Sequence, residues 1–154
     1  MKSDLAAQVI ATLQGKTLVT AESLTGGGIG HTLTGVSGSS AVYKGGIISY
    51  TNEVKNKVLG VPAEILEQYG AVSEPVAKAM AEGARKLLEA DIAVSVTGLA
   101  GPTGDEYGNP VGTVFIGYAN ADKTLVKHCL LTGDREVVRD HTIETAIQIV
   151  LENE

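Results

Sequence analysis

The sequence of 154 residues has one cysteine, no tryptophan and a single phenylalanine. One thiol can form neither an internal disulfide nor a multi-cysteine zinc site, so we exclude both. The cysteine, Cys129, lies in the apolar run Cys129-Leu130-Leu131, which favours a buried and unreactive thiol.

Positive charge is also scarce, since 12 lysine and arginine residues stand against 18 aspartate and glutamate residues, for a net charge of −6. Binding to a nucleic-acid backbone depends on clustered positive charge, and the sequence contains no such cluster. We therefore expect no nucleic-acid partner, whereas a small anionic ligand is compatible with this charge if its pocket is locally positive.

Long hydrophobic runs are absent. No apolar segment approaches the roughly 20 residues that cross a bilayer, and the N-terminus lacks a basic region followed by a hydrophobic one. We therefore expect a cytoplasmic protein with no membrane partner. With 44% hydrophobic residues, residues 1–154 are most simply one domain whose core needs no disulfide.

Glycine is plentiful, and four of the 19 glycines fall in the stretch Thr20–Gly30, which reads TAESLTGGGIG. The β-branched and apolar residues 16–20 predict a buried strand, and Ile29 and Leu33 begin a helical spacing. The glycines would then occupy the first turns of a helix, where each costs about 1 kcal/mol relative to alanine.

Two explanations account for the glycines at this point. Unpaired N–H groups at a helix start can face an anion or an oxyanion, with the hydroxyls of Ser23 and Thr25 beside them. Alternatively, the glycines allow close packing of the helix on the sheet, and Ser23 or Thr25 is a plain N-cap.

Helices and strands alternate through most of the chain. The pattern predicts strands at 16–20, 45–50, 91–97, 111–119 and 124–131, with the direction of the second strand left open. Helices are predicted to begin at Ser3, Thr51, Pro62, Ser73 and Asp134, with inward faces that include Leu87 and Val137. This order predicts a mixed, mostly parallel α/β sheet with helices on both faces.

In such sheets, ligands bind beyond the carboxyl ends of the strands. Three loops would converge there: the glycine turn after Ser23, the Tyr50–Lys55 turn, and the long loop 98–110. We therefore expect the functional site at this edge.

Ser23 needs an activating base if it is a nucleophile. His31 lies eight residues further along the predicted helix, about 12 Å away by helical rise. His128 is expected on a strand and His141 on the C-terminal helix, so a Ser-His-Asp triad has little support.

Lys55 is the better placed base, one turn into the helix that Thr51 would cap. To act near pH 7 its pKa must fall by about three units, through burial or through a nearby cation such as Lys44 or Lys57. Tyr50 would then relay the proton or hold the lysine in line. The alternative is a solvated Lys55 with Tyr50 as sheet-edge packing.

Several runs together carry a resemblance that extends over most of the chain in order. They are TAESLTGG (20–27), VSGSS and YKGGIISYTNEVK (within 36–55), LGV (59–61), GAVS (70–73), ADIAVSVTGLAGP (90–102), PVGTV (110–114) and GDREVVR (133–139). On these runs the sequence resembles the C-terminal domain of the CinA (competence/damage-inducible) family, whose free-standing members are PncC-like nicotinamide-nucleotide amidases.

The resemblance implies a three-layer α/β/α fold with a mixed sheet of about five strands. It also implies hydrolysis of the amide of nicotinamide mononucleotide to nicotinic acid mononucleotide and ammonia. The serine nucleophile, lysine and tyrosine of that family fall on Ser23, Lys55 and Tyr50.

Two departures from the family pattern matter. Leu24 stands where the family commonly has cysteine, which argues against thiol chemistry beside Ser23. Asp105 and Asn109 stand where the family usually has the second glycine of a pair and a lysine. Loss of that cation would weaken phosphate binding, and it favours a catalytically silent nucleotide-binding or regulatory module as the alternative function. A general small-amide hydrolase is a third alternative.

Our hypothesis is a pyridine mononucleotide amidase that requires neither metal nor cofactor. Backbone N–H groups near Thr25–Gly27 would stabilise the oxyanion, an effect typically worth about 3 kcal/mol. The apolar hairpin 111–131 would supply the surface of a homodimer. The residues expected to bind substrate are Thr25, Gly26, Gly27, Ser39, Ser40, Gly46, Arg135 and Arg139.

Overall fold

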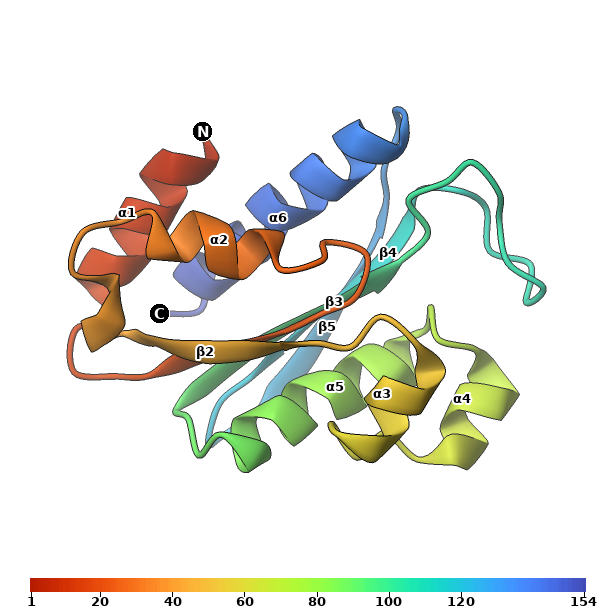
Figure 1. Ribbon diagram of the computed structural model, residues 1–154, viewed down its shortest axis with the longest axis horizontal. Coiled ribbons are helices and arrows are strands. Elements are labelled where there is room, and N and C mark those ends of the chain that lie inside the picture. The colour runs from red at the N-terminus through yellow and green to blue at the C-terminus, as the bar shows by residue number, and fades with distance from the viewer.

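The computed structural model describes residues 1–154, and its five strands form one sheet between two layers of helices (Figure 1). The sheet order is β2-β1-β3-β4-β5. The strands are β1 (Leu18–Glu22), β2 (Tyr43–Ile48), β3 (Ile92–Gly98), β4 (Thr113–Ala119) and β5 (Thr124–Leu130).

The pairing of the strands confirms the mixed, mostly parallel sheet. β1 pairs in parallel with β2 and with β3, whereas β4 is antiparallel to both β3 and β5. Four strands therefore point the same way and only β4 opposes them. The second strand, whose direction the sequence left open, is parallel to the first.

The helices divide between the two faces, which confirms the three-layer α/β/α fold (Figure 1). The larger core cluster has 22 buried residues and includes side chains from the sheet, α1, α2 and α6; the smaller has 10 and includes side chains from α4 and α5. One face carries α1 (Lys2–Thr12), α2 (Gly28–Thr34) and α6 (Arg135–Glu152), and the other carries α3 (Asn52–Lys57), α4 (Ala63–Tyr69) and α5 (Glu74–Leu87).

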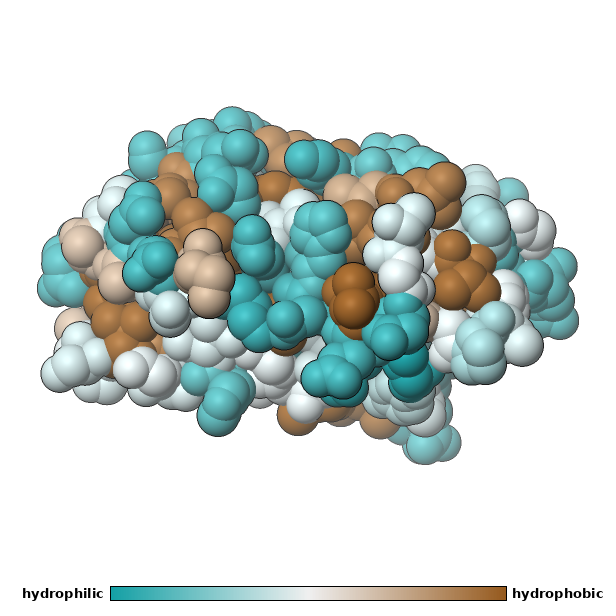
Figure 2. Space-filling view, turned by 90° about the horizontal axis from the view of Figure 1, so that it is seen from above, coloured by the Kyte–Doolittle hydropathy of each residue, from teal (hydrophilic) through white to brown (hydrophobic).

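The surface seen from above Figure 1 is drawn in Figure 2, where hydrophilic residues surround scattered hydrophobic ones. None of the helices combines the length and the apolar character needed to cross a bilayer.

Some predicted details are wrong. Ser3 lies inside α1, whose N-cap is Met1, so it does not cap that helix. Leu87 is 51% exposed and Val137 is 48% exposed, although both were predicted to face inward. Both lie in a terminal turn of their helix, where the apolar face extends past the part of the sheet that would bury it.

Candidate active site

The turn between β1 and α2 carries Ser23 and explains two of the glycines by backbone geometry. Gly26 and Gly27 have φ of 58° and 99°, in the left-handed region that favours glycine. Both precede the helix, which begins at Gly28 with Gly27 as its N-cap. The prediction that they sit in the first helical turn is therefore wrong.

The other two glycines of the stretch are explained by close packing. A Cβ atom on Gly28 would collide with the Ile143 side chain, and one on Gly30 would lie 2.7 Å from the Tyr43 hydroxyl. Neither Ser23 nor Thr25 is the N-cap of α2, so that part of the alternative explanation is wrong.

Lys55 meets Ser23 at the carboxyl end of β1. Its Nζ donates to Ser23 Oγ at 3.0 Å, to the Ser49 carbonyl at 2.8 Å and to the Tyr50 carbonyl at 3.2 Å. Thr51 caps α3 as predicted, since its Oγ1 accepts from the Val54 N–H at 3.3 Å, and this start places Lys55 one turn into the helix. The structure thus joins the serine and the lysine that the sequence pointed to.

The surroundings of Lys55 favour its neutral form. The side chain is 1% exposed and forms no ion pair with a carboxylate. Burial lowers the pKa of Lys55 from 10.5 to about 8. In the ammonium form, Lys55 donates its three hydrogens to Ser23 Oγ and to the two carbonyls. In the neutral form, the two carbonyls, which can only accept, take the two remaining hydrogens, and the lone pair faces Ser23.

Glu22, the last residue of β1, was missed by the sequence analysis, and its carboxylate lies at the start of α2. Its carboxylate accepts from the Ile29 N–H at 2.9 Å, the Gly30 N–H at 3.0 Å and the Thr25 hydroxyl at 2.6 Å. These helix N–H groups are therefore not free for an anionic ligand. An acidic residue just before a predicted helix start was the available signal, because carboxylates are stabilised there.

The turn itself retains N–H groups that could face a ligand. Gly26 donates to the Ser23 carbonyl and Gly28 to the Thr25 carbonyl, at 3.1 and 2.9 Å. The N–H groups of Leu24, Thr25 and Gly27 donate to no protein acceptor. Donors beside Ser23 are thus available within the predicted segment.

Two arginines of α6 approach this turn. Arg139 Nε donates to the Leu24 carbonyl at 2.8 Å, and Arg135 donates to the Gly101 carbonyl at 2.7 Å and to the Tyr50 hydroxyl at 3.3 Å. Neither guanidinium pairs with a carboxylate. The Tyr50 side chain is 60% exposed, and its hydroxyl contacts Arg135 whereas its backbone carbonyl holds Lys55.

A cavity of about 200 Å³ confirms that the three predicted loops converge. It opens beside the unpaired side chain of Arg135, which makes one wall positive. The lining residues are Leu24, Tyr50, Gly98, Leu99, Ala100, Gly101, Thr103, Gly104 and Arg135.

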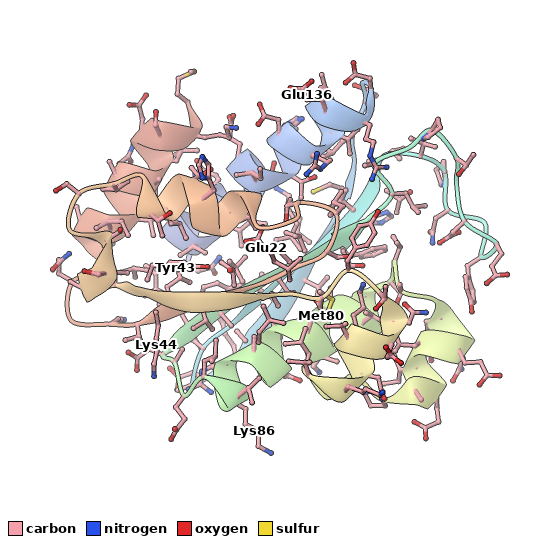
Figure 3. All side chains as sticks on the ribbon, viewed as in Figure 1. Glu22, Tyr43, Lys44, Met80, Lys86 and Glu136 are labelled. Atoms are coloured by element: carbon pink, nitrogen blue, oxygen red, sulfur yellow. The ribbon has the colours of Figure 1, made fainter.

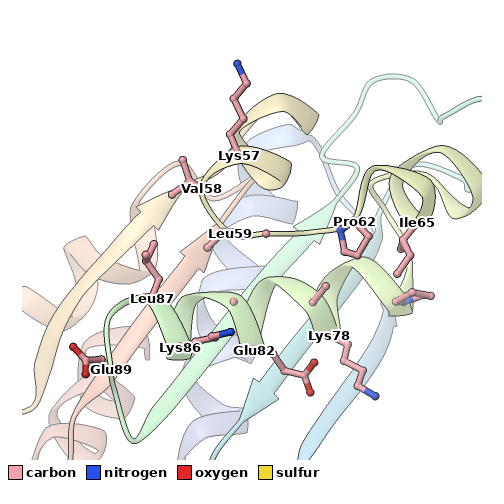
Figure 4. Close-up of a pocket in the computed structure, with 14 residues that line it drawn as sticks. Lys57, Val58, Leu59, Pro62, Ile65, Lys78, Glu82, Lys86, Leu87 and Glu89 are labelled. Carbon is pink, nitrogen blue, oxygen red and sulfur yellow. The ribbon is translucent and has the colours of Figure 1, made fainter.

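A larger groove, of about 1000 Å³, lies elsewhere, between α5 and residues 57–65 (Figure 4). Its rim carries the charged side chains of Lys57, Lys78 and Glu82, and none of the predicted site residues lines it. We place the candidate site at the smaller cavity, because the Ser23–Lys55 pair adjoins that one.

The structure does not bring Ser39, Ser40 and Gly46 to this cavity. The parallel register sets Tyr43 beside Leu18, so Ser39 and Ser40 precede the opposite end of β2, roughly 16 Å from Ser23 along a strand. Gly46 lies in mid-strand, where a Cβ atom would collide with Thr20 Oγ1, and close packing therefore explains this glycine.

Asp105 and Asn109, the departures in the long loop, brace that loop. The Asp105 carboxylate accepts from the Tyr107 N–H and from both the backbone and side-chain nitrogens of Asn109, at 2.8–3.0 Å. Asn109 Nδ2 also donates to the Val72 carbonyl at 3.1 Å. Both residues thus have a structural task in closing the loop and fastening it next to α5.

The remaining candidates take no part in this cluster. His31 and His141 are exposed on helices, and the His128 ring stacks on Phe115 with centroids 4.4 Å apart. Cys129 is half-buried rather than fully buried, and burial raises the pKa of its thiol. No group of three or more His, Cys, Asp or Glu side chains is arranged to hold a metal ion.

Residues 2–153 match the model of the CinA C-terminal domain. A CinA-like protein of Parasynechococcus marenigrum is 54% identical over 120 residues, which cover 77% of this chain and 29% of that protein. One of Mycolicibacterium gilvum is 47% identical over 144 residues, covering 93% of this chain and 34% of that protein. The chain thus spans about a third of the length of these curated relatives.

Solved structures agree over nearly the whole chain. A CinA superfamily protein from Escherichia coli superposes with a TM-score of 0.98 at 32% identity, covering 100% of this chain and 91% of that one. The competence/damage inducible protein CihA from Agrobacterium tumefaciens superposes with a TM-score of 0.96 at 37% identity, covering 99% and 96%.

Proposed function

This chain belongs to the CinA C-terminal domain family, and we propose that it is an amidohydrolase that converts nicotinamide mononucleotide to nicotinic acid mononucleotide and ammonia. One observation carries the proposal: a buried lysine without a carboxylate partner donates to Ser23 Oγ at 3.0 Å. The substrate follows from the family resemblance of the sequence motifs. The locally positive cavity beside the pair is compatible with a mononucleotide phosphate.

The first half of the reaction forms an ester on Ser23. Neutral Lys55 takes the hydroxyl proton while Ser23 Oγ attacks the carboxamide carbon, giving a tetrahedral oxyanion and a Lys55 ammonium. The ammonium then gives its proton to the amide nitrogen. The C–N bond breaks, ammonia leaves, and the nicotinoyl group stays on Ser23 as an acyl-enzyme.

The second half hydrolyses this ester. Lys55, neutral again, takes a proton from a water molecule as the water oxygen attacks the acyl carbon. The ammonium returns that proton to Ser23 Oγ as the C–O bond breaks. The acid product leaves and both side chains recover their starting states.

The turn and the arginines supply the remaining contacts in this proposal. The N–H groups of Thr25 and Gly27, which have no protein acceptor, would stabilise the oxyanion. Arg135 and Arg139, one turn apart on α6, would bind the phosphate. In this geometry Tyr50 orients Arg135 and walls the cavity.

The test is ammonia release from nicotinamide mononucleotide by the purified protein, beside Ser23→Ala and Lys55→Ala. We expect release by the wild type that is lost in both variants, while circular dichroism shows the fold retained. A Ser23→Ala protein with near-normal turnover would contradict the covalent mechanism.

Two parallel measurements separate the alternatives. Binding of the mononucleotide without ammonia release would favour the silent binding module. Equal turnover of free nicotinamide, which lacks ribose and phosphate, would favour a general small-amide hydrolase.

A further inference from the structure

We propose that Glu22 is a positioning residue that holds the Ser23 turn in the geometry that Lys55 requires. The proposal rests on the proposed role of Ser23 as nucleophile. Glu22 is 2% exposed and does not contact the reacting atoms, so any effect on the reaction passes through its neighbours. Figure 3 shows it in the middle of the molecule, between α2 and β2.

The carboxylate of Glu22 spans the turn from one side to the other. It receives hydrogen bonds from the Thr25 hydroxyl inside the turn and from the Ile29 and Gly30 N–H groups in the first turn of α2. Hydrogen bonds to a charged acceptor are stronger than those between neutral groups. Ser23 directly follows Glu22 and is therefore fixed between the strand and this set of contacts.

The backbone of Glu22 is tied to the other half of the pair. Its carbonyl accepts from the Ser49 N–H at 2.7 Å and from the Ser49 hydroxyl at 3.1 Å. Ser49 in turn accepts from Lys55 Nζ through its own carbonyl at 2.8 Å. Glu22 thus fixes the nucleophile through its side chain and the acceptor that orients the base through its main chain.

A buried carboxylate at this place also affects ligand binding. It fills the start of α2 with a negative charge, so an anionic group of a substrate is kept away from these N–H groups. Of the two α6 arginines without a carboxylate partner, Arg135 lines the cavity, and Arg139 donates to the Leu24 carbonyl within the turn. We therefore expect a substrate phosphate at Arg135 and not at the α2 N–H groups that Glu22 occupies.

The experiment measures how fast a fluorophosphonate probe labels Ser23 at pH 8, in wild type and in Glu22→Gln. Glutamine keeps the size of the side chain but turns an amide donor towards the N–H groups of α2. We expect labelling to slow by at least about tenfold, since displacements of about 1 Å at a reacting centre can cost 100-fold. Ser23→Ala identifies the labelled residue.

Tyr43→Phe is the matched control for lost stability. Its hydroxyl contacts Thr20 Oγ1 at 2.7 Å, and Thr20 contacts Glu22 at 3.4 Å, so the variant disturbs the same polar network away from the turn. We expect its labelling rate to stay within about twofold of wild type. The lost hydrogen bond lies away from the Ser23 turn, so its loss should lower the free energy of unfolding and leave the turn in place. The positioning role would be overturned if Glu22→Gln were labelled at the wild-type rate. It would also be overturned if Glu22→Gln and Tyr43→Phe were slowed equally.

A second pair of variants covers the case in which Glu22→Gln does not fold. Thr25→Val removes the hydroxyl that donates to the carboxylate, and Thr25→Ser restores it. Slow labelling of the valine variant with recovery in the serine variant supports the proposal, and equal rates overturn it. A wild type that is labelled but releases no ammonia contradicts the proposed amidase alone, whereas an inert wild type contradicts the nucleophile on which both rest.

Discussion

The Ser49 carbonyl oxygen lies 2.8 Å from Lys55 Nζ, closer than Ser23 Oγ at 3.0 Å. Ser49 is itself fully buried, and its N–H and hydroxyl are fixed by the Glu22 carbonyl. The acceptor that orients the amine is therefore held more firmly than a surface carbonyl would be. A neutral Lys55 held in this way points its lone pair at Ser23 Oγ.

The first prediction concerns the pH dependence of the reaction. Burial lowers the pKa of Lys55 to about 8, so below that pH the amine is protonated and has no lone pair for Ser23. We expect kcat/KM for nicotinamide mononucleotide to rise with pH and to reach half its plateau near pH 8. The measurement is a rate profile from pH 6 to 10, and a flat profile would contradict the role of Lys55 as base.

The second prediction concerns stability. Because the pKa of Lys55 is lowered on folding, the unfolded chain binds more protons between pH 8 and 10.5, and the free energy of unfolding gains from this group as pH rises through that window. We expect the difference between wild type and Lys55→Met to shift in favour of wild type by up to about 3 kcal/mol from pH 7 to pH 10.5.

Urea unfolding of both proteins at the two pH values measures this shift. Other groups that titrate in the same range, including Tyr43, whose pKa burial raises, contribute to both proteins and cancel in the difference. A difference independent of pH would show that Lys55 is protonated in the folded protein throughout.

The third prediction concerns the phosphate. We expect Arg135→Gln to raise KM for nicotinamide mononucleotide by about tenfold or more, since a charged hydrogen bond contributes about 1.5–3 kcal/mol. Turnover of free nicotinamide, measured in the same assay, should change much less.

Lys86→Gln is the control for the loss of one positive charge. Lys86 lies in the groove beside α5, away from the cavity (Figure 4). The KM of Lys86→Gln should equal that of wild type. An equal rise of KM in both variants would point to net charge, and no rise in Arg135→Gln would exclude this arginine from phosphate binding.

The sequence was sufficient for the parts of the site that depend on local pattern. Alternation and caps placed Ser23 after one strand and Lys55 one turn into a capped helix, and parallel pairing of β1 and β2 brings the two ends together. Register was not readable from these patterns. Ser39 and Ser40 were assigned to the substrate by their motif, yet the register of β2 sets them at its opposite end.

Glu22 escaped sequence reasoning for a different reason. Its partners Thr25, Ile29 and Gly30 are nearby in sequence, but they reach the carboxylate only because the left-handed Gly26 and Gly27 fold α2 back over β1.

The expected homodimer through the β4–β5 hairpin stays a prediction, although Leu130 on that hairpin is 63% exposed.

The fourth prediction separates two roles for Tyr50. Its hydroxyl contacts Arg135 at 3.3 Å, whereas Lys55 already contacts Ser23 directly, so no relay through the phenol is needed. We therefore expect Tyr50→Phe to lower kcat by less than about tenfold, below the 100-fold or more that loss of a general acid or base typically costs. The remaining effect should appear in KM, because Arg135 loses one of its two hydrogen-bond partners.

Steady-state kinetics of Tyr50→Phe beside Arg135→Gln and the double variant test this assignment. If Tyr50 acts through Arg135, the two changes in KM are not additive, and the double variant resembles Arg135→Gln alone. A loss of kcat as large as that of Lys55→Ala, with KM unchanged, would instead place the phenol in the proton path. The direct Lys55–Ser23 contact would then be a resting arrangement that the substrate must rearrange before proton transfer.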